Sequence, residues 1–189
     1  MAMVMIAFSG LIAQSVTYIP RIGINSSNID ANVGDLAFEG KQGWNLGLDT
    51  RFGTGMIWFS PGFHFYKTSL YVESVDLTDP LNRFTEEPDI NSIKVPVNIG
   101  INLTKPGGIL HLYGKAGVVG NVNFSFANTG DLDLRREDVR TFGAAANVGV
   151  GIDLLFFNIE ANYEFGLTDY FELSSGKNNV LTLGLGIKI

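Results

Sequence analysis

The clearest structural pattern in the chain covers residues 141–171, which read TFGAAANVGVGIDLLFFNIEANYEFGLTDYF. Every second residue from 142 to 154 is apolar, and the residues between them are glycine, alanine, asparagine and aspartate. The alternation pauses at Leu155 and Phe156 and then resumes over residues 157–167. Because successive side chains of a strand point to opposite faces, the pattern predicts two strands joined by a two-residue turn, which is a long β-hairpin.

The length of these strands indicates where the protein resides. Strands of soluble sheets usually hold about five or six residues, whereas a tilted strand needs about 9–11 residues to cross a bilayer. Each predicted strand of the hairpin has about ten residues or more, counted from the alternation. The hairpin therefore predicts a membrane-spanning β-barrel.

Composition excludes several classes of protein. The chain has 189 residues, which suits one domain, and 46% of them are hydrophobic. No apolar run approaches the roughly 18 residues of a membrane helix. Charged residues make only 17% and the formal net charge is −6, which argues against disorder and against a nucleic-acid partner. The chain contains no cysteine, so it has neither a disulfide framework nor a thiolate metal site.

The rest of the chain repeats the alternating pattern. Eight strands are expected, over residues 17–26, 43–52, 56–71, 93–103, 110–126, 142–154, 157–167 and 180–189. Long polar loops at 27–42, 74–90 and 127–140 and around 172–177 alternate with short turns. Short turns on one side and long loops on the other are typical of outer-membrane barrels, with the turns in the periplasm. The sequence predicts an all-β fold, an eight-stranded antiparallel up-and-down transmembrane β-barrel. The rival is a soluble lipocalin-like barrel with its apolar faces inside.

The charges decide which face meets lipid. A basic residue on the lipid face costs about 2–4 kcal/mol near the bilayer midplane, and the apolar faces carry almost no charge. The opposite faces carry a polar network expected in the lumen: Arg21, Asp49, Arg51, Lys94, Lys115, Asp153, Glu160, Glu164 and Lys188. Eight strands leave a lumen that side chains fill, so we expect no open channel and paired charges. From strand order, we expect Glu160 and Glu164 to pair with Lys188 and Arg21.

Aromatic residues near the expected strand ends are candidates for the girdles at the two membrane interfaces. They are Tyr18, Trp44, Phe52, Trp58, Phe59, Phe157 and Tyr170. At the N-terminus, residues 1–14 resemble a secretory signal, with an apolar core and small residues near Ala13, although a basic first region is missing. We expect residues 15–189 to form the single barrel domain.

No arrangement of residues predicts catalysis, a cofactor or a metal. His64 and His111 are expected in the lumen but apart, and Ser60 is too far from His64 along an extended strand for a hydrogen bond. We therefore expect no enzyme, no catalytic or cofactor-binding residues and no metal ligands. Glycines spaced as in GVGIDL (residues 149–154) fit strands whose lumen-facing glycines make room for neighbouring side chains.

The loops are the expected place for interactions. A candidate interaction surface lies in the second loop: Asp76, Asp79, Phe84, Glu86, Glu87 and Asp89. Solvated loops, a divalent-ion site and a docking surface for another protein all fit this acidic segment.

Several segments resemble the PorT-like outer-membrane β-barrel proteins of Bacteroidetes. IKVPVNIGINL (residues 93–103) resembles the family's strand pattern (L/I)-x-(I/V)-P, and RIGINSSNI (21–29) resembles its first strand. FGAAANVGVGIDL, NIEANYEFGLTD and NVLTLGLGIKI resemble its last three strands, although the chain ends in Ile189 instead of the aromatic residue common there. The resemblance implies an outer-membrane barrel in a Gram-negative bacterium, and the family's namesake assists a secretion system.

These observations lead to a functional expectation. We expect a non-enzymatic outer-membrane barrel with a structural or interaction role, or an accessory subunit of an envelope assembly. Its partners would be outer-membrane lipid or lipopolysaccharide and another envelope protein, with no nucleic acid. A small-solute pore is the first alternative, and a lipid-modifying enzyme is the second.

Overall fold

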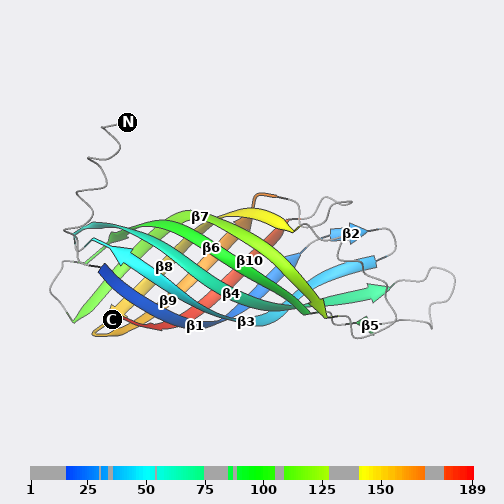
Figure 1. Ribbon diagram of the computed structural model, residues 1–189, viewed down its shortest axis with the longest axis horizontal. Helices are drawn as coiled ribbons and strands as arrows, with labels where there is room; N and C mark the ends of the chain where they lie inside the picture. Colours follow the sequence, from blue (N-terminus) through cyan, green and yellow to red (C-terminus); the bar gives the residue numbers. More distant parts are fainter. Residues whose placement is uncertain are drawn as a thin grey trace.

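Eight long antiparallel strands close into a barrel in the computed structural model (Figure 1). The structure describes residues 16–29, 31–33, 36–53, 55–74, 85–86, 89–104, 109–127, 141–168 and 177–189. The long strands are β1 (Val16–Ile29), β3 (Leu36–Phe52), β4 (Ile57–Ser74), β6 (Asp89–Asn102), β7 (Leu110–Ala127), β8 (Phe142–Leu154), β9 (Phe157–Gly166) and β10 (Asn178–Ile187). Among the described residues, no helix is long and apolar enough to cross a membrane.

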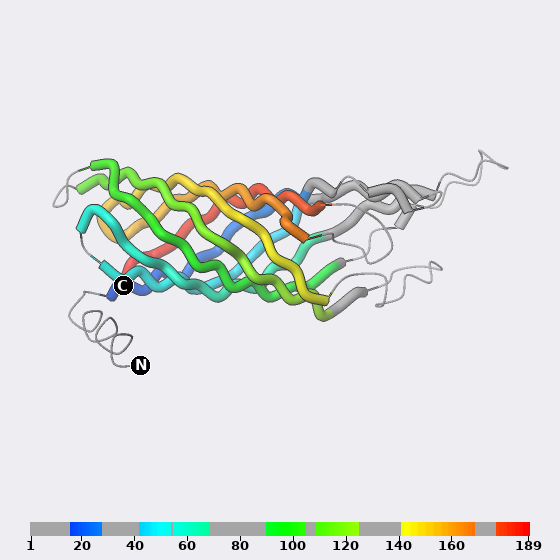
Figure 2. The backbone as a smooth tube through the Cα atoms, turned by 90° about the horizontal axis from the view of Figure 1, so that it is seen from above, coloured from blue at the N-terminus to red at the C-terminus, as the bar shows by residue number. Residues whose placement is uncertain are grey.

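Each long strand pairs with the next long strand in the sequence, and the first strand pairs with the last. β1 pairs antiparallel with β10, with Arg21 opposite Gly186. Two backbone hydrogen bonds extend this closure, from Tyr18 N to Ile189 O at 2.9 Å and from Ile189 N to Tyr18 O at 2.8 Å. The eight strands therefore satisfy each other's backbone groups all round the barrel, as a structure surrounded by hydrocarbon requires. The strands run obliquely around the long axis (Figure 2).

Two short strands extend the sheet at the end of the barrel away from the C-terminus (Figure 1). β2 (Ala31–Val33) pairs with β3, and β5 (Thr85–Glu86) pairs with β4. The expectation of loops throughout residues 27–42 and 74–90 was therefore wrong, because β1 reaches Ile29, β4 reaches Ser74 and β6 begins at Asp89. The strands continue beyond the part of the barrel whose outer surface is apolar, because strand pairing needs only backbone groups. Alternation in the sequence is visible only where the two faces of a strand meet different surroundings.

The hairpin that dominates the sequence forms as expected. β8 and β9 pair from Ala145 opposite Gly166 to Leu154 opposite Phe157. The two-residue turn places Leu155 at φ 54°, a left-handed conformation that non-glycine residues adopt in tight hairpin turns. The backbone N–H of Leu155 donates to the carbonyl of Ile109 at 3.0 Å, which ties the turn to the neighbouring strand.

The two faces of the strands differ in chemistry. On β10, Leu181, Leu183 and Leu185 point outward and are 45–59% exposed, whereas Thr182 between them is 3% exposed and faces the lumen. The same parity holds on β6, where Ile99 is outward and Asn98 is fully buried. The interior is therefore polar and the exterior is apolar, which is the reverse of the rival soluble barrel.

Candidate functional site: the polar lumen

All nine charged residues of the predicted network turn toward the lumen. Eight of them are at most 9% exposed, and the side chain of Lys188 is 23% exposed. Five are cationic (Arg21, Arg51, Lys94, Lys115 and Lys188) and four are carboxylates (Asp49, Asp153, Glu160 and Glu164). Burying a charge alone is costly, and each of these groups has an oppositely charged neighbour.

Glu160 on β9 is the centre of the network. Its carboxylate forms a buried ion pair with Arg21 and a second with Lys115 at 2.5 Å. The hydroxyl of Tyr113 donates to its Oε2 at 2.7 Å. Arg21 also reaches Asp49, with Nη2 and Oδ2 3.1 Å apart. One carboxylate thus joins side chains from β1, β7 and β9 across the middle of the lumen.

A second cluster closes the end of the lumen near the short turns. Asp153 accepts hydrogen bonds from Arg51 at 2.7 Å, Lys188 at 3.0 Å and Asn158 at 2.6 Å. The guanidinium carbon of Arg51 lies 4.2 Å from the ring centroid of Trp58, close enough for a cation–π interaction. Charged, amide and aromatic groups therefore fill this end together.

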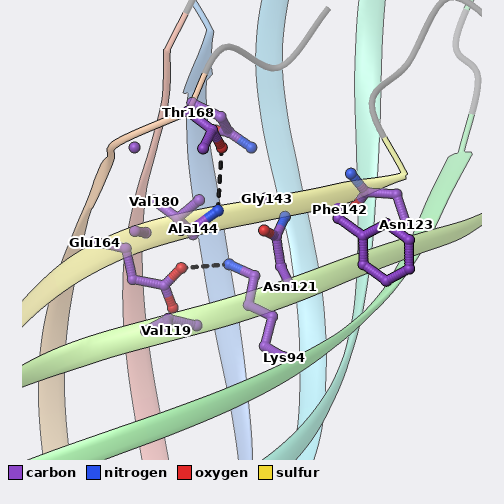
Figure 3. A pocket seen from close by; sticks show the side chains of 13 residues that line it. Lys94, Val119, Asn121, Asn123, Phe142, Gly143, Ala144, Glu164, Thr168 and Val180 are labelled. Carbon is purple, nitrogen blue, oxygen red and sulfur yellow. Dashed lines mark hydrogen bonds and ion pairs between the residues drawn. The ribbon is translucent and has the colours of Figure 1, made fainter.

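A third cluster lies toward the loops. Lys94 Nζ donates to Glu164 Oε2 at 2.5 Å (Figure 3). The same ammonium group sits 4.1 Å from the ring centroid of Tyr66, whose hydroxyl is 3.4 Å from Thr182 Oγ1. The three clusters follow one another along the barrel from the turn end to the loop end.

Glycines on neighbouring strands make room for the largest lumen side chains. A Cβ atom added at Gly100 would lie 2.0 Å from the Trp58 ring, and one at Gly151 would lie 2.2 Å from Tyr113. Both distances are far below van der Waals contact, so a larger residue at either position would force the neighbouring ring to shift. The glycine spacing seen in the sequence thus lets aromatic and charged side chains cross a narrow lumen.

Comparison with known proteins agrees with this architecture. The family described as outer membrane protein beta-barrel domain matches residues 1–188. The chain belongs to this family. It is therefore an outer-membrane β-barrel protein, and its apolar exterior faces lipid. No curated protein matches the sequence significantly.

Solved structures with a similar fold are outer-membrane barrels of Gram-negative bacteria. Ail, the attachment invasion locus protein of Yersinia pestis, was crystallised with the heparin analogue sucrose octasulfate; it is 17% identical, with a TM-score of 0.51, over 93% of this chain and 99% of that one. OprG of Pseudomonas aeruginosa is 12% identical, with a TM-score of 0.55, and the match covers 93% of this chain and 97% of OprG. Neisserial surface protein A is 10% identical, with a TM-score of 0.53, and the match covers 93% of this chain and 99% of that protein. At such identities the likeness shows the fold alone.

The ion pairs differ in part from those expected from strand order. The structure pairs Glu160 with Arg21 as expected, but Glu164 pairs with Lys94, and Lys188 pairs with Asp153. The expected pairs were chosen from strands that lie close together in the strand order. Lys94 on β6 and Glu164 on β9 are separated by two intervening strands. In an eight-stranded barrel opposite walls lie within reach of long side chains, so pairing across the lumen replaces pairing along the wall.

One aromatic residue differs from the girdle prediction. Trp58 is 3% exposed and points into the lumen, where its Nε1 donates to Asn102 Oδ1 at 3.0 Å. Its parity on β4, between outward Ile57 and Phe59, is the sequence signal that predicts this orientation. The outward girdle candidates are Tyr18, Trp44, Phe59 and Phe157. Phe52 is half-buried and Tyr170 lies outside the described residues.

The histidines do not form a recognisable catalytic group. His64 Nε2 lies 2.9 Å from Asp49 Oδ1 in the buried lumen, and His111 is half-buried near the start of β7. Within the described ranges, no group of three or more His, Cys, Asp or Glu residues is arranged to hold a metal ion. Of the candidate loop surface, Asp76, Asp79, Phe84 and Glu87 lie outside the described residues, and Glu86 and Asp89 are described by their backbone in β5 and β6.

Proposed function

We propose that the protein is a non-enzymatic outer-membrane barrel whose lumen is a structural core and whose activity lies at surfaces outside the lumen. The observation that carries this proposal is the series of three ion-pair clusters along the barrel, centred on Asp153, Glu160 and Glu164. Removing one partner of a buried pair costs about 3–5 kcal/mol. A solute path would have to break such pairs at three levels, which disfavours a pore.

The surfaces left for function are the outer wall and the loop end. We propose a structural or interaction role there, or a role as accessory subunit of an envelope assembly of the secretion type. The partners would be lipopolysaccharide or other outer-membrane lipid and another envelope protein. The candidate loop surface of residues 76–89 would contribute to such contacts, and its acidic character would favour a basic partner.

The sequence motifs support a more specific assignment. Similarity of residues 93–103 and of the last three strands to the PorT-like barrels supports membership of that group and an origin in Bacteroidetes. On the same reasoning, residues 1–14 would be removed as a signal peptide during export.

The first experiment compares this proposal with a pore. The purified protein is inserted into planar lipid bilayers and its conductance is recorded. We expect no conductance above the background of the bilayer. Stepwise openings of the unmodified protein would contradict the proposal and favour the small-solute pore.

A second experiment looks for the partner. The tagged protein is extracted from its native outer membrane in a gentle detergent, and bound proteins are identified by mass spectrometry. A stoichiometric envelope protein supports the accessory-subunit role, and a barrel recovered alone supports a stand-alone structural role. Altered lipid A or phospholipid in cells that overproduce the protein would instead favour the lipid-modifying enzyme.

A further inference from the structure

Two small cavities follow one another in the loop half of the lumen. The mouth cavity, of about 30 Å³, lies near the rim and is bordered by Asn121, Thr168 and Asn178, among others (Figure 3). The central chamber, of about 20 Å³, lies deeper and is bordered by Asn147 and Asn162 among others. Each volume exceeds the roughly 10–15 Å³ that one water molecule needs.

Three of the residues that border the central chamber carry a polar atom that lacks a partner. Asn147 Oδ1, Asn162 Oδ1 and His64 Nδ1 are buried and have no hydrogen-bond partner among the described residues. Asn147 is only 4% exposed and His64 only 6%. Buried polar groups are almost always satisfied by protein or ordered water. Two of these atoms are amide carbonyl oxygens, which accept hydrogen bonds from a donor such as water.

The two ends of the chamber are closed by different numbers of ion pairs. Toward the turns lies the Glu160 cluster, in which Lys115 and Arg21 both hold the same carboxylate. Toward the loops, Lys94 and Glu164 belong to the walls of both the central chamber and the mouth cavity. A single ion pair therefore forms much of the partition between the two cavities (Figure 3).

We propose that the central chamber is a dead-end hydrated site, which binds water and other water-sized hydrogen-bond donors and exchanges them only through the Lys94–Glu164 pair. Opening that pair joins the chamber to the mouth cavity. The Glu160 cluster below it stays closed, so no passage crosses the membrane. This site adds a small-molecule compartment to a barrel whose proposed function needs none.

A thiol placed in the chamber tests this proposal. The chain has no cysteine, so Asn147→Cys introduces a single one. Ag⁺ is a water-sized cation that reacts with thiols. The protein is exposed to Ag⁺ in chloride-free detergent solution, and the rate of the reaction is measured as the decrease, with time, in the amount of thiol that can still be alkylated. Adding Lys94→Ala and Glu164→Ala to Asn147→Cys removes the partition without leaving a lone charge. We expect the reaction to accelerate by about tenfold or more.

Matched controls make the outcome decisive. Arg51→Ala, Asp153→Ala and Lys188→Ala together remove the ion pairs of the turn end without leaving a lone charge, and they should leave the reaction rate of the Asn147→Cys thiol unchanged. A thiol at the outward-facing neighbour, introduced by Val148→Cys, should stay unreactive in every background, which verifies that the barrel remains folded. Equal rates with and without the Lys94–Glu164 pair, or equal acceleration by both sets of substitutions, would overturn the proposal.

Discussion

The outward and inward faces of the same strands follow opposite rules of burial. Outward side chains are apolar and exposed at the barrel surface, as Ile22 and Leu183 are at 59% and 50%. Most inward side chains are polar or charged and almost fully buried, as Asp49 and Asn98 are at 2% and 0%, and buried aromatic residues such as Trp58 lie among them. A soluble protein would show the reverse. The outer face is solvated by hydrocarbon, so paired charges and hydrogen bonds hold the interior together alongside the packing of its buried aromatic residues.

The largest expected effect comes from the inward face, at Glu160. Glu160→Gln leaves Lys115 without its carboxylate and weakens the pairing of Arg21, so we expect a loss of about 3–5 kcal/mol in the free energy of unfolding. Urea unfolding in detergent micelles measures it. Glu164→Gln is the matched control, because it leaves only Lys94 unpaired and should cost less. A larger loss for Glu164→Gln would place the centre of the network elsewhere.

The outward face is tested by a charge at mid-barrel. Leu183→Arg places a cation among lipid chains, and we expect a cost of about 2–4 kcal/mol in the free energy of folding into lipid vesicles. The same change at Ile109, next to the start of β7, should cost about 0–1 kcal/mol because arginine reaches the interface there. If the two variants fold equally well, the outer face does not meet hydrocarbon.

A smaller effect separates glycines of the two faces. Gly151→Ala brings a methyl group against Tyr113 in the lumen, and overpacking of this kind costs about 1–3 kcal/mol. Gly120→Ala on the outward face meets nothing within 4 Å, so its unfolding midpoint should stay equal or rise slightly. Thermal unfolding of both variants measures the difference, and a destabilised Gly120→Ala variant would show that the outward glycine has a structural role of its own.

The smallest effect is expected at the turn end of the lumen, in the cluster centred on Asp153. Lys188→Met should change the free energy of unfolding by about 0–1 kcal/mol, because its side chain is partly exposed and Asp153 keeps Arg51 as a partner. Arg51→Met should cost more, since it also removes the contact with Trp58. Parallel urea titrations test this order, and equal costs would mean that the turn end is as dry as the centre.

The strands were predictable from the sequence wherever lipid and lumen impose different chemistry on alternate residues. On β10 and β6, the alternation of successive residues correctly predicts which side chains point outward and which point into the lumen. The same alternation on β4 orients Trp58 toward the lumen. Beyond the apolar belt the alternation disappears, so the ends of β1 and β4 and the short strand β2 were expected to be loops. There the backbone ladder continues, and pairing between backbone groups requires no alternation of side chains.

The eight-stranded barrel, its apolar exterior and the inward orientation of its charges follow from the amino-acid sequence alone, because a strand's two-residue period ties each side chain to one face. Which charges meet depends instead on the three-dimensional fold. Closure of the barrel and the oblique course of its strands bring Lys94 to Glu164 and Lys188 to Asp153. Those distances depend on how the strands are shifted against one another around the whole ring, which no local pattern of residues encodes.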